Sequence, residues 1–194
     1  MKKKTLQLSL MLALCITAFT SCDYFGGGGR KYETADGVAS LVSDLKSEFG
    51  KDAWYTDINF SYHKSTGTST SATGTKDPAS KKMIEKTRLK GTWKDNSEIT
   101  LSLTGDAKPE DFMFTLTELG DLKKLPDMIK LAVDKIKKEK NFDVVATNIT
   151  VHSPDRLKEN SEKFSYLLSL QPENGGTSFS VIFDQKGDFK KIID

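Results

Sequence analysis

Residues 34–62 read TADGVASLVSDLKSEFGKDAWYTDINFSY and combine the two patterns from which the fold is inferred. The first part places five apolar residues on one helical face, at positions i, i+3, i+4, i+7 and i+11. Thr34 or Asp36 can cap this helix, and Gly50 can end it. The second part alternates apolar with polar residues, which predicts a strand with one buried face. The helix face consists of Val38, Leu41, Val42, Leu45 and Phe49, and the strand face of Ile58, Phe60 and Tyr62.

The same two patterns return at residues 125–151, LPDMIKLAVDKIKKEKNFDVVATNITV. A constant offset of 91 residues places Val38 on Ile129 and Ile58 on Ile149 without a gap. Self-similarity at a fixed period indicates a structural repeat, so we predict the same helix–strand module twice. The alternative is that two unrelated amphipathic helices each precede a strand. The other matched pairs are Leu41 with Ala132, Val42 with Val133, Leu45 with Ile136, Thr56 with Thr147, and Phe60 with Val151.

More strands are expected in both halves, because apolar and polar residues alternate between turn-forming segments. Residues 64–80 are mostly Ser, Thr, Gly, Ala and Lys, which predicts a mobile loop. A turn is expected at residues 95–97, and an offset of 80 matches residues 99–103 with residues 179–183. The expected strands are 54–62, 83–93, 99–103 and 112–116 in the first half, and 144–151, 164–170, 179–183 and 189–193 in the second.

These patterns predict an α+β fold of two tandem modules, at residues 34–118 and 119–194, each with one helix and three or four antiparallel strands. Each module is too small for high stability alone. The two can join into one continuous sheet with both helices on one face, or pack as two sheets. The order of elements resembles that of PepSY-like and β-lactamase-inhibitor-protein-like helix-on-sheet modules. The resemblance covers element order only, so it implies no functional residues.

The first 22 residues have the pattern of a secretory signal. Lys2, Lys3 and Lys4 precede an apolar run at residues 6–19, which is too short to span a bilayer. The run ends in FTSC at residues 19–22, which resembles the lipobox of bacterial lipoproteins. This resemblance implies that residues 1–21 are removed and that the Cys22 thiol receives lipid. The alternative is an ordinary signal that ends near a cysteine.

Residues 22–33 are expected to form a tether, because residues 26–29 are four consecutive glycines and behave as flexible coil. The tether would hold the domain away from a membrane to which Cys22 anchors it. Asp23 is the only acid before Glu33, whereas some surface-exported lipoproteins carry an acidic cluster after the lipidated cysteine. We therefore expect a cell-envelope location, at the outer rather than the inner membrane and facing the periplasm rather than the cell surface.

Charge and cysteine content narrow the functional classes. The chain has 29 basic and 27 acidic residues, and three of the basic residues lie in the signal, so the mature chain has a net charge of 26 − 27 = −1. A near-neutral chain with mixed charges is not typical of a nucleic-acid-binding protein. The two cysteines are Cys15, which leaves with the signal, and Cys22. We therefore expect no disulfide, and stability that comes from burial alone.

No motif in the sequence indicates catalysis. His63 and His152 follow the first strand of each half at nearly equivalent places, but the ligand spacing of a metal site is missing. They can be a shared metal or acid–base pair, or two surface histidines at strand ends. We expect no catalytic residue, metal or cofactor. Trp54, Tyr55 and Trp93 can form an exposed patch that binds a partner, or they can belong to the core.

Three functions remain open from the sequence. The first is a lipid-anchored, non-catalytic envelope protein whose sheet, or whose groove between the two halves, binds a partner protein or an envelope polymer. The second is an inhibitor of a secreted or periplasmic enzyme that acts through residues 64–80. The third is a small hydrolase centred on His63 or His152.

Overall fold

The computed structural model describes residues 29–153 and 162–194. In this part of the chain, two α-helices and nine strands form an α+β fold with an antiparallel sheet, which confirms the predicted fold class. The helices are α2 (Ala35–Phe49) and α3 (Leu125–Lys140), and short 3₁₀ segments include η1 (Lys31–Glu33) and η4 (Gly120–Leu122). The strands are β1 (Trp54–His63), β2 (Gly67–Thr75), β3 (Lys82–Leu89), β4 (Thr92–Thr100), β5 (Phe114–Thr115), β6 (Val145–His152), β7 (Ser165–Gln171), β8 (Phe179–Phe183) and β9 (Phe189–Ile193).

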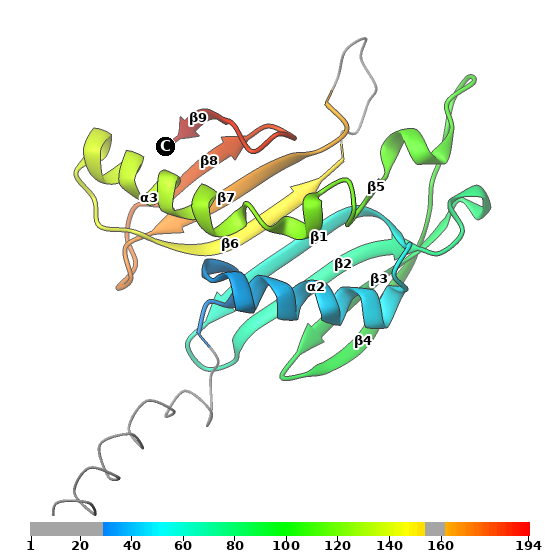
Figure 1. Ribbon diagram of the computed structural model, residues 1–194, viewed down its shortest axis with the longest axis horizontal. Helices are drawn as coiled ribbons and strands as arrows, with labels where there is room; N and C mark the ends of the chain where they lie inside the picture. Colours follow the sequence, from blue (N-terminus) through cyan, green and yellow to red (C-terminus); the bar gives the residue numbers. More distant parts are fainter. Residues whose placement is uncertain (1–28, 154–161) are drawn as a thin grey trace, which may run out of the picture.

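The strands follow the order β4-β3-β2-β1-β6-β7-β8-β9, and β5 pairs with the start of β1. Every pair of neighbours is antiparallel, and the chain runs outward from the centre in two meanders. In Figure 1, α2 lies in front of β1 to β3, and α3 lies in front of β6 to β8. The segment between β4 and α3 therefore runs from the β4 edge of the sheet to the half that contains β6 to β8. This segment includes β5 and η4.

Both predicted helices form for the reasons that their sequences indicate. In α2, the Gly37 N–H donates to Thr34 Oγ1 at 3.1 Å, and Gly50 ends the helix with a φ of 99°. In α3, Pro126 occupies the first turn, and Asn141 follows the helix in the left-handed region. All five residues of the predicted α2 stripe are buried, as are Leu125, Ile129, Ala132 and Ile136 of the α3 stripe.

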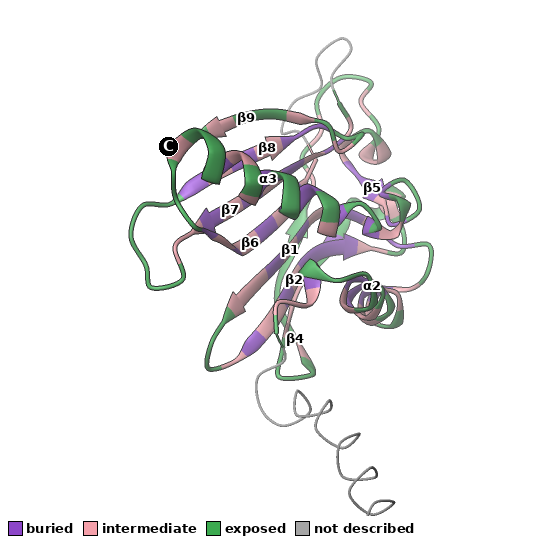
Figure 2. Ribbon diagram, turned by 60° about the vertical axis from the view of Figure 1, so that its left-hand side comes forward, coloured by how far each residue is buried: buried purple, intermediate pink, exposed green. Residues whose placement is uncertain are grey.

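The hydrophobic core is one cluster that contains residues of both helices and of strands from both halves. At the centre of the sheet, β1 and β6 pair Ile58 with Val151 and Phe60 with Ile149, and all four side chains are fully buried. Figure 2 shows buried residues along the inner strands, whereas the edge strand β4 is mostly exposed. The two halves thus share one core rather than each having a separate one.

The prediction of a mobile loop at residues 64–80 is wrong, because Gly67–Thr75 form the inner strand β2 between β1 and β3. This strand needs few apolar residues of its own, since neighbouring aromatic side chains fill the space beside it. A Cβ on Gly74 would lie 2.9 Å from both the Trp54 carbonyl oxygen and Tyr55 Cδ1, so only glycine fits there. The hypothesis of an inhibitor that acts through this segment loses the loop on which it was based.

The strand boundaries expected between residues 83 and 116 are also wrong. The chain turns at Lys90 and Gly91, which both have positive φ, so residues 83–93 belong to two strands. Residues 95–97 lie inside β4, where a bulge in the pairing with β3 absorbs the extra residue. Residues 101–104 form no strand, and only Phe114–Thr115 pair within the segment 112–116. The match of residues 99–103 with 179–183 therefore fails, because β4 is an edge strand and β8 is not.

Asp184 stabilises the turn between β8 and β9. Its buried carboxylate accepts hydrogen bonds from the backbone N–H groups of Lys186 and Asp188, both at 2.9 Å, and Lys190 Nζ lies 2.7 Å from Oδ2. Burial by itself would raise the pKa of Asp184, but these hydrogen bonds outweigh it and hold the pKa below its ordinary value.

We expect Asp184→Asn to lower the free energy of unfolding at pH 7 by about 2 kcal/mol, because the amide cannot form the charge-assisted bond to Lys190. Since the folded-state pKa is lowered, the carboxylate stabilises the fold fully above its unfolded-state pKa of about 4, and this stabilisation is lost as the pH falls through the folded-state value. Urea denaturation should show the difference between the two proteins shrinking below about pH 4. The exposed Asp188→Asn is the matched control, and a difference that does not change with pH would contradict the assignment.

Candidate functional site

A groove runs along one side of α2, and we call it the α2 groove. Residues 121–123, at the end of η4 and just before α3, form its other wall. The groove has a volume of about 600 Å³, which is larger than two other hollows of about 410 and 330 Å³ in residues 29–153 and 162–194. A volume in this range is typical of ligand sites. Its lining residues are Ala35, Val38, Ala39, Val42, Ser43, Lys46, Asp121 and Lys123.

The position of this groove follows from the helical period of α2. Val38 and Val42 belong to the buried stripe, and the small residues Ala35, Ala39 and Ser43 lie beside that stripe on the exposed flank. Because these side chains are short, they leave a channel where larger residues would close the gap toward η4. The opposite flank of α2 is instead tied to β3 by ion pairs of Asp44 with Arg88 and of Glu48 with Lys86.

Three charged side chains line the α2 groove. Lys46 Nζ lies 2.8 Å from Asp121 Oδ1, and each of these side chains is 35% exposed. Lys123 is exposed and forms no ion pair within the described part of the chain. The groove therefore has an apolar section along the first two turns of α2, and its lining includes one more cation than anions.

The three aromatic residues singled out from the sequence do not lie together. Tyr55 is fully buried and packs against Phe49 and Phe114. Trp93 is half-buried on the helix side of the sheet, with its ring 5.7 Å from that of Phe49. Trp54 precedes Tyr55 on β1, and Lys163 Nζ lies 5.1 Å above its ring. Trp54 and Trp93 are thus partly accessible at separate places, and the partner-binding role remains a prediction for them.

The Tyr55 hydroxyl is buried and has no hydrogen-bond partner among the described residues. Burial raises the pKa of this phenol. Tyr32, by contrast, is equally buried, but its hydroxyl donates to the Ala146 carbonyl oxygen at 2.9 Å.

The two histidines have different surroundings. His63 is exposed, and its Nδ1 lies 2.8 Å from Ser65 Oγ, two residues away. His152 lies on β6 between Asp57 of β1 and Ser165 of β7, which are its registered partners. Burial raises the pKa of Asp57, and the nearby charge of His152 opposes that effect. Neither histidine forms an ion pair with a carboxylate in the described residues, and the nearest polar contact of His152 is Ser165 Oγ at 3.5 Å.

Asp57, His152 and Ser165 form a polar row on the face of the sheet opposite the core. The sequence did not reveal this row, because the three residues lie far apart in the chain and meet only through the β1–β6–β7 register. Side chains of these types can carry out proton transfer and nucleophilic attack. None of the three, however, lines the α2 groove or the two smaller hollows described above.

The signal, Cys22 and the glycine tether up to residue 28 lie outside the described residues. Within the part described, neither helix combines the length and apolar composition needed to cross a bilayer. The same part contains no cluster of three His, Cys, Asp or Glu side chains that could bind a metal ion. The sequence also missed the α2 groove, although Ala35, Ala39 and Ser43, four residues apart beside the apolar stripe, were a readable signal for it.

Comparisons with known proteins identify no relative. No protein-family model matches the chain, and neither a curated protein nor a solved structure matches it.

Proposed function

We propose that this protein is a lipid-anchored, non-catalytic binding protein of the bacterial cell envelope, and that the α2 groove is its binding site. The α2 groove is the observation that supports binding, because it is the largest of the three hollows and is bounded by a rigid helix. The signal at residues 1–22 supports anchoring through lipid on Cys22. A partner protein or an envelope polymer could also contact Trp54 and Trp93.

The short stretch of chain between Cys22 and α2 limits the distance between the lipid anchor and the α2 groove. Gly29, where the described chain begins, is seven residues after Cys22, and this stretch reaches at most about 25 Å when extended. Gly29 is only six residues before Ala35, at the apolar end of the α2 groove. Lipidation of Cys22 would therefore keep this groove close to the membrane surface, and we propose the periplasmic side of the outer membrane.

We further propose that the fold arose from two tandem modules that share one continuous sheet, with both helices on one face. The β1–β6 register supports this proposal, because Asn59 pairs with Thr150 and their side chains are hydrogen-bonded at 2.8 Å, 91 residues apart. A two-fold axis through this pair would exchange residues that are 91 positions apart, which is the offset found in the sequence. It relates the pair Ile58–Val151 to the pair Phe60–Ile149, and both pairs are in register.

Replacement of Cys22 tests the proposed anchoring. We expect Cys22→Ser to move the protein from the membrane to the soluble fraction of broken cells, or to leave the signal uncleaved, since serine cannot accept the thioether-linked lipid. Cys15→Ser is the matched control, because Cys15 leaves with the signal and its replacement should change nothing. Fractionation with immunodetection measures both variants. A Cys22→Ser protein that is processed and membrane-bound like the wild type would refute the proposal.

A further inference from the structure

We propose that the α2 groove binds the acyl chain of an anionic amphiphile, with the chain along α2 and the charged head beside Lys123. This inference rests on the proposed function only in taking the α2 groove as the binding site. It assigns a class of ligand: a single hydrocarbon chain that ends in a carboxylate or a phosphate.

The apolar section of the groove favours a hydrocarbon chain over a peptide. Ala35, Val38, Ala39 and Val42 line this section and offer no polar side-chain atom. From Val38 onward, the backbone N–H groups of α2 are already bonded within the helix. An extended peptide lying here would turn N–H and C=O groups toward this apolar wall, where they have no partners, at a cost of about 1–3 kcal/mol for each. A hydrocarbon chain has no such groups, and its burial is favourable.

The dimensions of the groove favour the same ligand. From Ala35 to Lys46 the groove follows 11 residues of α2, or about 16 Å along the helix axis. This length can hold one extended hydrocarbon chain laid along the helix.

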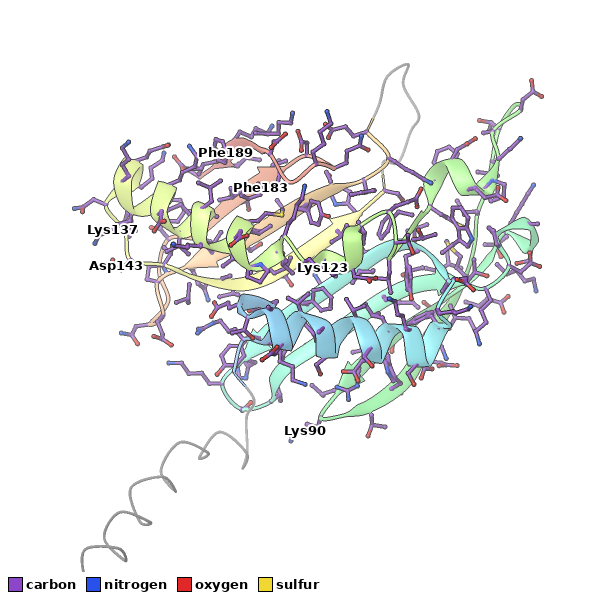
Figure 3. The ribbon with its side chains drawn as sticks, in the orientation of Figure 1. Lys90, Lys123, Lys137, Asp143, Phe183 and Phe189 are labelled. Atoms are coloured by element: carbon purple, nitrogen blue, oxygen red, sulfur yellow. The ribbon has the colours of Figure 1, made fainter. Side chains whose placement is uncertain are left out.

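The charged side chains that line the groove favour an anionic head. Lys46 is neutralised by Asp121, whereas Lys123 has no ion-pair partner in the described residues. Figure 3 labels Lys123 in the space between α3 and α2. An anion placed here would gain a charged partner, and a cation would be repelled.

The test uses the chain from residue 22 onward with Cys22→Ser, which carries no lipid but retains the whole core, since the core begins at Tyr32. Calorimetry would measure binding of dodecanoate and of dodecyltrimethylammonium, below their micelle concentrations. We expect dodecanoate to bind with one-to-one stoichiometry and the cationic probe to bind at least about tenfold more weakly. Equal binding of both probes, or no binding of dodecanoate, would overturn the proposal.

Two matched pairs of variants locate the site. Ala39→Phe fills the groove at an exposed position and should abolish binding, whereas Ser47→Phe, exposed two turns further along α2 and outside the groove lining, should not. Lys123→Glu should weaken dodecanoate binding about tenfold, and Lys130→Glu, an equal charge change on exposed α3 surface, should leave it unchanged. Unchanged binding by Ala39→Phe would place the ligand elsewhere and overturn the proposal.

A further arm identifies the source of the anionic head. Lauroyl-lysophosphatidylglycerol carries a phosphate in place of the carboxylate on a chain of the same length. Tighter binding of this probe supports a phospholipid as the ligand, and tighter binding of dodecanoate supports a free fatty acid. The binding assay uses unlipidated protein, so a lack of binding would not contradict anchoring through Cys22. In the same way, a lack of lipid on Cys22 would not contradict binding in the α2 groove.

Discussion

Gly37→Ala is expected to lower the free energy of unfolding by about 3 kcal/mol, although alanine favours helices more than glycine does. A Cβ at position 37 would lie 2.0 Å from the carbonyl oxygen of Lys31, in η1. The η1 backbone cannot easily move away, because the adjacent Tyr32 is buried and its hydroxyl is bonded to Ala146. Urea denaturation followed by circular dichroism measures the loss.

Ser47→Ala is the control for this prediction, because Ser47 is exposed on the same helix. Its free energy of unfolding should stay the same or rise by a few tenths of a kcal/mol, as helix propensity predicts. If Gly37→Ala were as stable as the wild type, η1 would not be packed against α2 as described.

Leu168→Ala is expected to lower the free energy of unfolding by about 3 kcal/mol and to shift the unfolding of the opposite half by the same amount. Leu168 is fully buried on β7, in the one cluster that spans both halves. Both tryptophans of the chain, Trp54 and Trp93, lie on strands of the first half. Since the halves share a core, tryptophan fluorescence and circular dichroism should report one coincident transition that moves to lower denaturant concentration.

Leu167→Ala provides the matched control, because Leu167 precedes Leu168 on β7 and faces the other side of the sheet, where it is half-buried. Its replacement should lower the free energy of unfolding by less than about 1 kcal/mol. If Leu168→Ala shifted the circular dichroism but left the tryptophan transition in place, the halves would unfold separately and the shared core would be disproved.

The sequence predicted those helices and strands whose own residues show a periodic pattern of apolar side chains. Both helices and the strands β1 and β6 to β8 have apolar stripes that the structure buries. The strand β2 was missed because Phe49 and Tyr55, from other elements, fill the space at Gly74 that its own side chains leave empty. The turn at Lys90 and Gly91 was missed because residues 83–93 read as one extended segment.

The candidate site was less predictable than the fold, since it depends on which distant segments meet. The short side chains of Ala35, Ala39 and Ser43 indicate one wall of the α2 groove, but nothing in the sequence indicates that residues 121–123 lie beside them. The row of Asp57, His152 and Ser165 likewise arises only from the pairing of three strands. Tyr55 was a candidate binding residue because of its aromatic side chain. It is fully buried and offers no surface to a partner.

The anchoring at Cys22 is the central claim, and mass spectrometry of the mature N-terminus tests it most directly. Protein purified from membranes should yield an N-terminal peptide that starts at Cys22 and carries thioether-linked acyl groups. A mature chain that starts at any other residue, or an unmodified Cys22, would contradict the account.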